Sequence, residues 1–222
     1  MPETEAMTDR SDPVAETRRS YDVIARTYLG RKRSRPPDGY LLDLLASFCC
    51  KLPAGGRVAD LGCGHGFEVH ALLERGMRPL GIELSAGMLT CAAEVVPGRL
   101  IQADLRRLPL ADASLDGVWS VHALLHVPAA ELPSVLADVR RVLRPGGQAA
   151  LSLAGGDDEH REEVAYWPDR YRTFVRWRLP ELLTVVGQAR LEVNHSGHAP
   201  EAGRDTVWLL ARRPRDATTE HT

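Results

Sequence analysis

The sequence has little of what marks secreted, membrane-spanning, metal-binding or nucleic-acid-binding proteins. Its cysteines, Cys49, Cys50, Cys63 and Cys91, form no CxxC pair and no metal-ligand spacing, so we expect reduced thiols and no metal. The acidic N-terminus has no apolar signal segment, and no apolar run approaches the length of a membrane span. A formal net charge of -2 provides no field that favours nucleic acid or an anionic membrane as partner. We therefore expect a cytoplasmic protein, with monomer and homodimer both left open.

Short apolar runs alternate with helical patterns through the middle of the chain. Strands are expected at 57–61, 78–84, 99–104, 114–121 and 148–153, with helices between most of them. This alternation indicates βαβ units, and hence a parallel sheet with right-handed crossovers. Two helices, near 14–28 and 38–50, are expected before the sheet. A helix near 180–188 and two strands forming an antiparallel hairpin are expected after it.

Three glycines at alternate positions, Gly62, Gly64 and Gly66, follow the first expected strand. Ligands of open parallel sheets bind beyond the carboxyl ends of the strands. A nicotinamide site has the spacing GxGxxG and binds a pyrophosphate at a helix N-terminus. Here the spacing is GxGxG, and Asp60 stands two residues before the first glycine. A carboxylate repels a diphosphate but suits a cationic amine, so the loop favours an amino-acid moiety.

Two further acids end the next two expected strands. Glu83 follows the glycine loop by about twenty residues, where a carboxylate accepts both ribose hydroxyls of a nucleoside. Asp104 is placed to accept a hydrogen bond from an adenine amine, with the amide of Leu105 serving a ring nitrogen. Each match alone is weak, but the ordered set at three consecutive strand ends is specific for an adenosine ligand.

The segments VADLGCGHG, GIELS, QADL, LDGVWSVHALLHVP and RVLRPGG lie within 57–153. With them the sequence resembles the class I S-adenosylmethionine-dependent methyltransferases. SYDVIARTY, DRYRTFVRWRLPELL and GRDTVWLLARRP are similar to small stand-alone members, so the resemblance covers most of the chain. It implies an α/β fold with a Rossmann-like, doubly wound, seven-stranded, mostly parallel sheet whose last strand is antiparallel. It also implies S-adenosyl-L-methionine as cofactor, S-adenosyl-L-homocysteine as product and a small-molecule acceptor.

The expected organisation is one methyltransferase domain over 13–213, between a disordered tail over 1–12 and a second tail over 214–222. Its parts are N-terminal cap helices over 13–56 and a cofactor-binding core over 57–153. A substrate-side insertion and helix follow over 154–190, and an edge hairpin over 191–213. The basic stretch 30–39 is expected to be solvated or to form a mobile lid.

The resemblance also implies a set of cofactor-binding positions. They are Tyr28, Asp60, Gly62, Cys63, Gly64, Gly66, Glu83, Leu84, Met88, Asp104, Leu105 and Ser120. The loop with Asp60 matches the part that holds the methionine moiety, and Ser120 matches a contact on the sulfonium side. Cys63 matches a position that contributes backbone, so its thiol is expected to be a bystander. Glu68 departs from the small or basic residues expected at its position, and its role stays open.

Three residues are candidates for catalysis on the acceptor side: His126, His122 and Tyr21. Either histidine is a base or an acceptor-orienting group, or it is a buried residue that fixes the loop after the fourth strand. If that loop begins a helical turn, the two histidines share a face. Tyr21 and Tyr28 fall on one face of the first helix, so a hydroxyl lies near the cofactor or both rings pack that helix onto the sheet.

The segment 162–178 contains aromatic residues that are candidates for lining the acceptor pocket. They are Tyr166, Trp167, Tyr171, Phe174 and Trp177. The alternative is that they cover the edge of the sheet. Interleaved arginines and aromatics also occur in proteins that bind single-stranded nucleic acid, but the near-neutral charge argues against that partner.

The sequence therefore predicts methyl transfer to oxygen or nitrogen of a small molecule. Because the leaving group is good, positioning of the acceptor is expected to contribute more than dedicated catalytic groups. One alternative is a cyclase or isomerase in which the bound sulfonium is only structural. Another is a non-enzymatic cofactor-binding protein, although a scaffold has no need of three ordered strand-end acids.

Overall fold

The computed structural model describes residues 12–34, 39–201 and 204–215. The expected tails over 1–12 and 214–222, apart from residues 12, 214 and 215, lie outside these ranges, as do residues 35–38 of the basic stretch. None of the helices within the ranges combines the length and the apolar character needed to cross a membrane.

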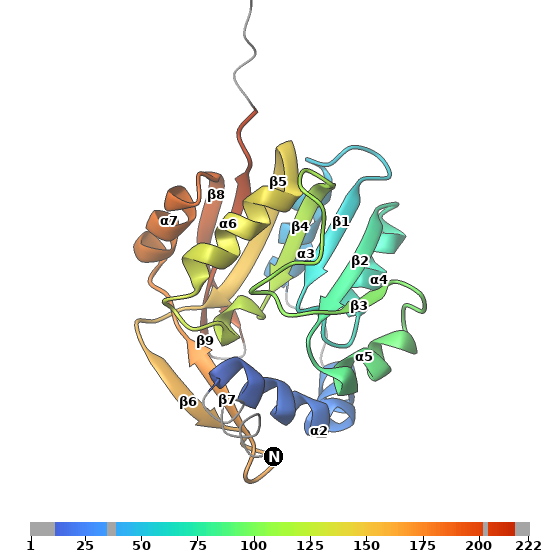
Figure 1. Ribbon diagram of the computed structural model, residues 1–222, viewed down its shortest axis with the longest axis vertical. Coiled ribbons are helices and arrows are strands. Elements are labelled where there is room, and N and C mark those ends of the chain that lie inside the picture. Colours follow the sequence, from blue (N-terminus) through green and yellow to red (C-terminus); the bar gives the residue numbers. More distant parts are fainter. Residues whose placement is uncertain (1–11, 35–38, 202–203, 216–222) are drawn as a thin grey trace, which may run out of the picture.

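Seven strands form one twisted sheet in the order β3-β2-β1-β4-β5-β9-β8 (Figure 1). They are β1 (Arg57–Leu61), β2 (Arg78–Glu83), β3 (Leu100–Gln102), β4 (Leu115–Val121), β5 (Leu143–Ala154), β8 (Glu192–Glu201) and β9 (Arg204–Arg212). Strands β1 to β5 pair in parallel, while β9 runs antiparallel to both β5 and β8. The predicted α/β fold, with its antiparallel last strand, is confirmed.

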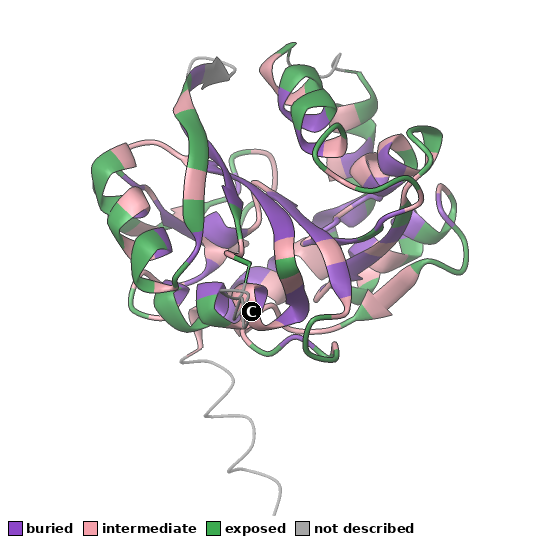
Figure 2. Ribbon diagram, turned by 90° about the horizontal axis from the view of Figure 1, so that it is seen from above, coloured by how far each residue is buried: buried purple, intermediate pink, exposed green. Residues whose placement is uncertain are grey.

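Helices cover both faces of the sheet. They are α2 (Pro13–Arg33), α3 (Gly39–Cys49), α4 (Phe67–Glu74), α5 (Ala86–Ala93), α6 (Leu132–Val142) and α7 (Leu179–Gln188), with a 3-10 turn, η1 (Leu124–His126). Successive residues of β4 serve opposite faces, because side chains alternate along a strand. Val118 packs in the cluster under α6 and α7, whereas Trp119 packs against Phe48 of α3 with ring centroids 5.5 Å apart. Figure 2 shows the buried residues concentrated on the central strands.

The segment 154–178 contains a hairpin that the sequence analysis did not expect. Strands β6 (Glu159–Glu163) and β7 (Tyr171–Val175) form a separate two-stranded antiparallel sheet. The charged residues of β6 give no apolar alternation, so the strand has no sequence signal. The hairpin is stabilised by α2, which lies beside it (Figure 1). The Thr173 amide donates to the Thr17 hydroxyl at 3.0 Å, and the Ser20 hydroxyl donates to the Tyr171 carbonyl at 2.6 Å.

Helix α2 lies across the carboxyl ends of the parallel strands and is fixed there by polar contacts. Its N-cap, Asp12, accepts from the Val14 amide at 2.9 Å. Further along, Asp22 Oδ1 accepts from the Ser85 hydroxyl at 2.7 Å and from the Gly87 amide at 3.1 Å. The backbones of α2 and α5 come so close that a Cβ on Gly87 would lie 2.4 Å from the Asp22 carbonyl oxygen. This contact requires glycine.

Gly87→Ala is therefore expected to force α2 away from α5 and to lower the free energy of unfolding by about 1–3 kcal/mol. Urea denaturation measures this change. The matched control is Gly187→Ala in α7, where a Cβ meets nothing within 4 Å. The control is expected to keep or raise stability, by up to about 1 kcal/mol. A Gly87→Ala protein as stable as wild type would contradict the described docking of α2.

Candidate functional site

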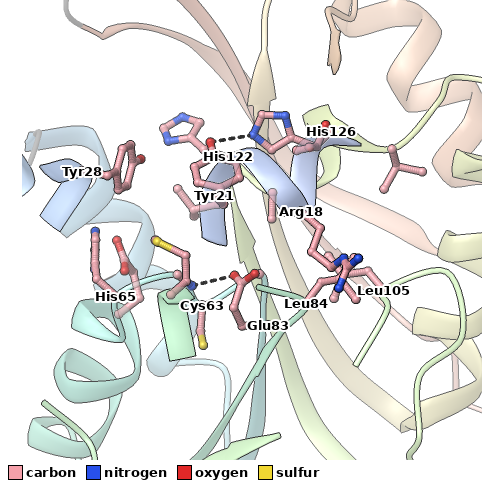
Figure 3. Close-up of a pocket in the computed structure, with 18 of the residues that line it drawn as sticks. Arg18, Tyr21, Tyr28, Cys63, His65, Glu83, Leu84, Leu105, His122 and His126 are labelled. Atoms are coloured by element: carbon pink, nitrogen blue, oxygen red, sulfur yellow. Dashed lines mark hydrogen bonds between the residues drawn. The ribbon is translucent and has the colours of Figure 1, made fainter. Parts of the chain in front are cut away.

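A cavity lies where the carboxyl ends of β1, β2 and β4 face helix α2 (Figure 3). Many residues expected at the site line it: Tyr21, Tyr28, Gly62, Cys63, Gly64, Glu83, Leu84, Met88, Asp104, Leu105, His122 and His126. These positions come from six separate parts of the chain, and the fold brings them to one wall. Of the remaining expected residues, Asp60, Gly66 and Ser120 are not part of that wall.

The glycine loop has a conformation and a packing that other residues do not fit. Gly62 and Gly64 have φ of +73° and +52°, in the left-handed region. A Cβ on Gly62 would lie 2.2 Å from the Ala123 Cβ, in the loop after β4. The glycine loop was expected to bind the amino-acid moiety of a ligand. The structure adds a reason for the glycines themselves, since the loop also packs closely against the protein.

Asp60 lies beneath this loop with a carboxylate that is almost completely buried. The residue is 2% exposed, and its Oδ2 atom has no hydrogen-bond partner within the described part of the chain. Burial raises the pKa of Asp60 well above its ordinary range, and the nearby carboxylates of Glu68 and Glu83 raise it further. A buried acid without a partner is destabilising, and a cation removes the imbalance. The position thus fits a bound ammonium group, reached directly or through water.

Glu83 ends β2 with its carboxylate fixed by the backbone. Oε1 accepts from the Ser85 amide at 2.8 Å, and Oε2 accepts from the Gly64 amide at 3.1 Å. Burial raises the pKa of Glu83, while these amides act in the opposite direction. Each carboxylate oxygen has a second lone pair, so both oxygens remain able to accept a hydroxyl. The arrangement fits a vicinal diol such as that of a ribose.

Asp104 follows β3 and is held by an arginine that the sequence analysis did not single out. Arg106 Nε donates to both Asp104 oxygens, at 3.1 and 2.9 Å. The same guanidinium reaches Asp12 Oδ2 through Nη2 at 2.8 Å. Arg106 therefore connects an expected adenine contact to the N-terminus of α2. The carboxylate still lines the cavity.

At the other end of the cavity, Tyr21 and His126 form a defined hydrogen-bond chain. His126 Nδ1 lies 2.6 Å from the Thr173 carbonyl, so this nitrogen carries the proton and donates. Nε2 therefore accepts from the Tyr21 hydroxyl, 3.0 Å away, and that hydroxyl accepts from Arg172 Nη1 at 3.1 Å. Burial lowers the pKa of His126 to about 3. The imidazole is neutral near pH 7 and holds the Tyr21 hydroxyl at the cavity.

His122 directly follows β4 and has an unusual backbone conformation. Its φ is +54°, a value that is uncommon for residues other than glycine and is found where function constrains the backbone. Its Nε2 lies 3.3 Å from the Tyr40 hydroxyl, which is 3.3 Å from the Ser152 hydroxyl. The turn η1 begins at Leu124, so His122 and His126 do not share a helical face. Within the described ranges, no group of three or more His, Cys, Asp or Glu is arranged to hold a metal.

Several expected contacts are not placed at the cavity. Ser120 is buried, and its hydroxyl donates to the Leu61 carbonyl at 3.0 Å, which ties β4 to β1. None of the five aromatic residues expected to line an acceptor pocket belongs to the cavity wall. Tyr166 lies under the Arg31 guanidinium at 4.4 Å, and Trp177 is part of the main core. Arg161 lies over the Tyr171 ring at 3.4 Å, and the Phe174 ring is 4.9 Å from the His126 ring. A role of these aromatic residues toward an acceptor stays a prediction.

The cavity is also lined by residues that the sequence analysis did not assign to the site. Helix α2 contributes Val14, Thr17, Arg18 and Lys32, and the glycine loop region contributes His65 and Glu68. The remaining members are Leu41, Val121, Ala123 and Val127. A signal for the α2 residues existed, because the helical spacing of Tyr21 and Tyr28 extends to these positions. His65 had none: its burial between Tyr28 and Phe67, with centroids 6.1 and 4.1 Å away, depends on long-range packing.

Residues 59–151 match a protein family described as a methyltransferase domain. The chain is 30% identical over 211 residues to malonyl-(acyl-carrier protein) O-methyltransferase of Dechloromonas aromatica, covering 88% of this chain and 78% of that protein. Other curated relatives are matched over less than two thirds of their own length.

Among solved structures, the fold is similar to 1,6-didemethyltoxoflavin-N1-methyltransferase of Burkholderia thailandensis, which was solved with 1,6-didemethyltoxoflavin and S-adenosylhomocysteine. The TM-score is 0.67 at 21% identity, covering 88% of this chain and 87% of that one. The (4+2)-cyclase SpnF is similar with a TM-score of 0.70 at 19% identity, covering 90% of this chain and 96% of that one. At identities this low, the similarity to these two structures shows a shared fold and no more.

The buried Asp60 carboxylate gives a testable pH dependence of stability. Folding raises the pKa of Asp60. Its contribution to the stability of the folded protein is therefore most favourable at pH values below the ordinary pKa near 3.8, and it is lost as the pH rises through the raised pKa. Asp60→Asn removes this loss, so the ligand-free variant is expected to exceed wild type in stability, increasingly from pH 4 to pH 8. Urea denaturation at several pH values measures the difference. Exposed Asp43→Asn is the control, and an Asp60→Asn protein that is less stable throughout this range would contradict the assignment.

The hydrogen bonds of His126 lead to a second prediction. Its ring is expected to stay neutral, with the proton on Nδ1, from pH 5 to pH 8, because its pKa is about 3. Nitrogen-15 NMR of the imidazole measures both the charge and the tautomer, and His126→Gln identifies the signal by its loss. Protonation of the His126 ring within that pH range would show that Nε2 is not engaged by Tyr21.

Proposed function

The chain belongs to the class I S-adenosylmethionine-dependent methyltransferases, and from this membership we propose that it methylates oxygen or nitrogen of a small molecule. The observation that carries the proposal is the unpaired, buried carboxylate of Asp60, directly beneath a loop at the carboxyl end of β1. That carboxylate suits the ammonium group of the cofactor's methionine moiety. It does not suit a dinucleotide pyrophosphate.

The strand-end acids divide the remaining cofactor contacts between them. Glu83, held by two backbone amides, accepts the ribose hydroxyls. Asp104 accepts from the adenine amine, with Leu84, Met88 and Leu105 forming the apolar surroundings of the adenosine. Tyr28 closes the methionine side from α2, where its ring faces His65. Burial raises the pKa of the Cys63 thiol, which supports its assignment as a bystander.

When bound, S-adenosylmethionine supplies an electrophilic methyl group on a sulfonium. The role of the chain is to hold an acceptor in line with that group and to exclude water. Such orientation contributes about 7–11 kcal/mol to lowering a barrier. Tyr21 and His122 line the same cavity. We assign Tyr21 to positioning the acceptor, and His122 to positioning it and accepting its proton. His126 acts through Tyr21, because both of its ring nitrogens are engaged.

The names of the similar proteins are consistent with transfer to oxygen or nitrogen. One relative is named as an O-methyltransferase of malonyl-(acyl-carrier protein), in which the acyl group is attached to a carrier protein, and one structural neighbour is an N-methyltransferase solved with 1,6-didemethyltoxoflavin. The acceptor atom is therefore assigned only as oxygen or nitrogen. A neighbour named as a cyclase has the same fold, so chemistry without methyl transfer is the second candidate. Incubation with methyl-labelled cofactor distinguishes the two, because only a methyltransferase moves the label into a product.

Calorimetry on the purified protein tests the cofactor assignment. S-adenosylmethionine and S-adenosylhomocysteine are expected to bind with micromolar affinity, and NADH is expected not to bind. Asp60→Asn and Glu83→Gln each remove a charged hydrogen-bond partner, so each is expected to weaken S-adenosylhomocysteine binding about 10- to 100-fold. Asp43→Asn, a change at an exposed residue that is not part of the cavity wall, is the control. Wild-type affinity in both variants would contradict the site.

A further inference from the structure

Arg18 is a cation of helix α2 that lines the cavity and has no counter-ion among the residues that the structure describes. Figure 3 shows its side chain reaching from the helix to the region of Leu84 and Leu105. The residue is half-buried, and within the described part of the chain it makes no hydrogen bond or ion pair. A half-buried guanidinium without a partner is uncommon, because its donors lose water and gain nothing in return. This position therefore indicates a ligand.

The acids near Arg18 are already engaged by other groups. Arg106 holds both oxygens of Asp104, and the amides of Ser85 and Gly64 hold those of Glu83. Among the described residues, Arg18 forms no ion pair with these strand-end carboxylates. What it faces instead is the apolar part of the cavity formed by two leucines that follow β2 and β3.

The direction of Arg18 is set by the residues around it on α2. Thr17 accepts from the Thr173 amide at 3.0 Å, and the Tyr21 hydroxyl lies 3.0 Å from His126 Nε2. These contacts, one residue before Arg18 and three after it, fix both the rotation and the position of the helix. The side chain therefore projects from a fixed element, which limits the entropy lost on binding.

We propose that Arg18 is a cofactor-binding residue whose guanidinium stacks on the adenine ring of S-adenosylmethionine, beside Leu84 and Leu105. The guanidinium is planar and weakly hydrated, and it binds aromatic faces more readily than an ammonium does. The inference rests on the proposed function, since it requires an adenosine in the cavity. With this contact, α2 binds the cofactor directly, in addition to covering the cavity.

The test compares two ligands that share the adenosine and differ in the amino acid. S-adenosylhomocysteine carries the methionine-derived moiety, whereas 5′-methylthioadenosine lacks it. Arg18→Met keeps an unbranched, flexible side chain and removes the guanidinium. It is expected to raise the Kd of both ligands roughly 5- to 30-fold. Arg18→Lys, which keeps the charge without the plane, is expected to recover only part of this loss.

Arg26→Met is the matched control on the same helix, because Arg26 is exposed and pairs with Glu94 at 2.8 Å. It is expected to bind both ligands as wild type does. Thermal unfolding without ligand checks that the Arg18 variants are folded, and no change is expected because Arg18 has no partner to lose.

Two results would overturn the inference while leaving the proposed function intact. A loss confined to S-adenosylhomocysteine would place Arg18 at the methionine carboxylate. Unchanged affinity for both ligands would remove it from the cofactor site. If the wild-type protein binds neither ligand, the proposed function fails, and the inference fails with it.

Discussion

Helix α2 is held across the carboxyl ends of the parallel strands, and the rest of the site depends on this docking. Asp22 binds the start of α5, Thr17 and Ser20 bind β7, and Asp12 binds Arg106. Without these contacts, the cavity would be an open groove at the edge of the sheet. With them, the helix covers the glycine loop and places Arg18 and Tyr21 at the cavity.

Because α2 covers the cavity, carboxylates of the site are buried, and this burial raises their pKa values. Glu68 and Glu83 lie close enough to Asp60 for their charges to raise its pKa, and burial disfavours the ionised forms of Asp60 and Glu83. Such a cluster lowers the stability of the ligand-free protein, and a cationic ligand offsets the loss. This exchange of stability for affinity is common at binding sites. At the acceptor end the opposite holds, because the polar groups of Tyr21, His126 and Arg172 engage one another.

The central strands and helices were predictable because the sequence patterns that specify them lie within each element. Strand β1 covers the residues expected for it, 57–61, and α5 begins with a local N-cap, since the Ser85 side chain accepts from the Met88 amide. The hairpin β6–β7 had no such signal, since its strands are stabilised by α2, more than a hundred residues earlier. The same reason applies to site residues. Glycine spacing identified the loop, but the pairing of Arg106 with Asp12 depends on tertiary packing.

The acceptor end shows a further limit of sequence reasoning. His122 and His126 appeared equivalent by spacing, yet one has a left-handed backbone and contacts Tyr40, while the other is locked against Thr173. The aromatic residues of the hairpin also matched a pocket by composition and are not part of the cavity wall. Residue type identifies histidines and aromatic residues as candidates for a site. Whether a given side chain faces the cavity or packs against the protein depends on the tertiary structure.

The most direct test of the account is a crystal structure of the protein with S-adenosylhomocysteine. The account predicts the ammonium group over Asp60, the ribose hydroxyls on Glu83, and the adenine between Asp104 and the Arg18 guanidinium, with α2 closed above them. A ligand bound away from the carboxyl ends of β1 and β2, or contacting none of these residues, would contradict it.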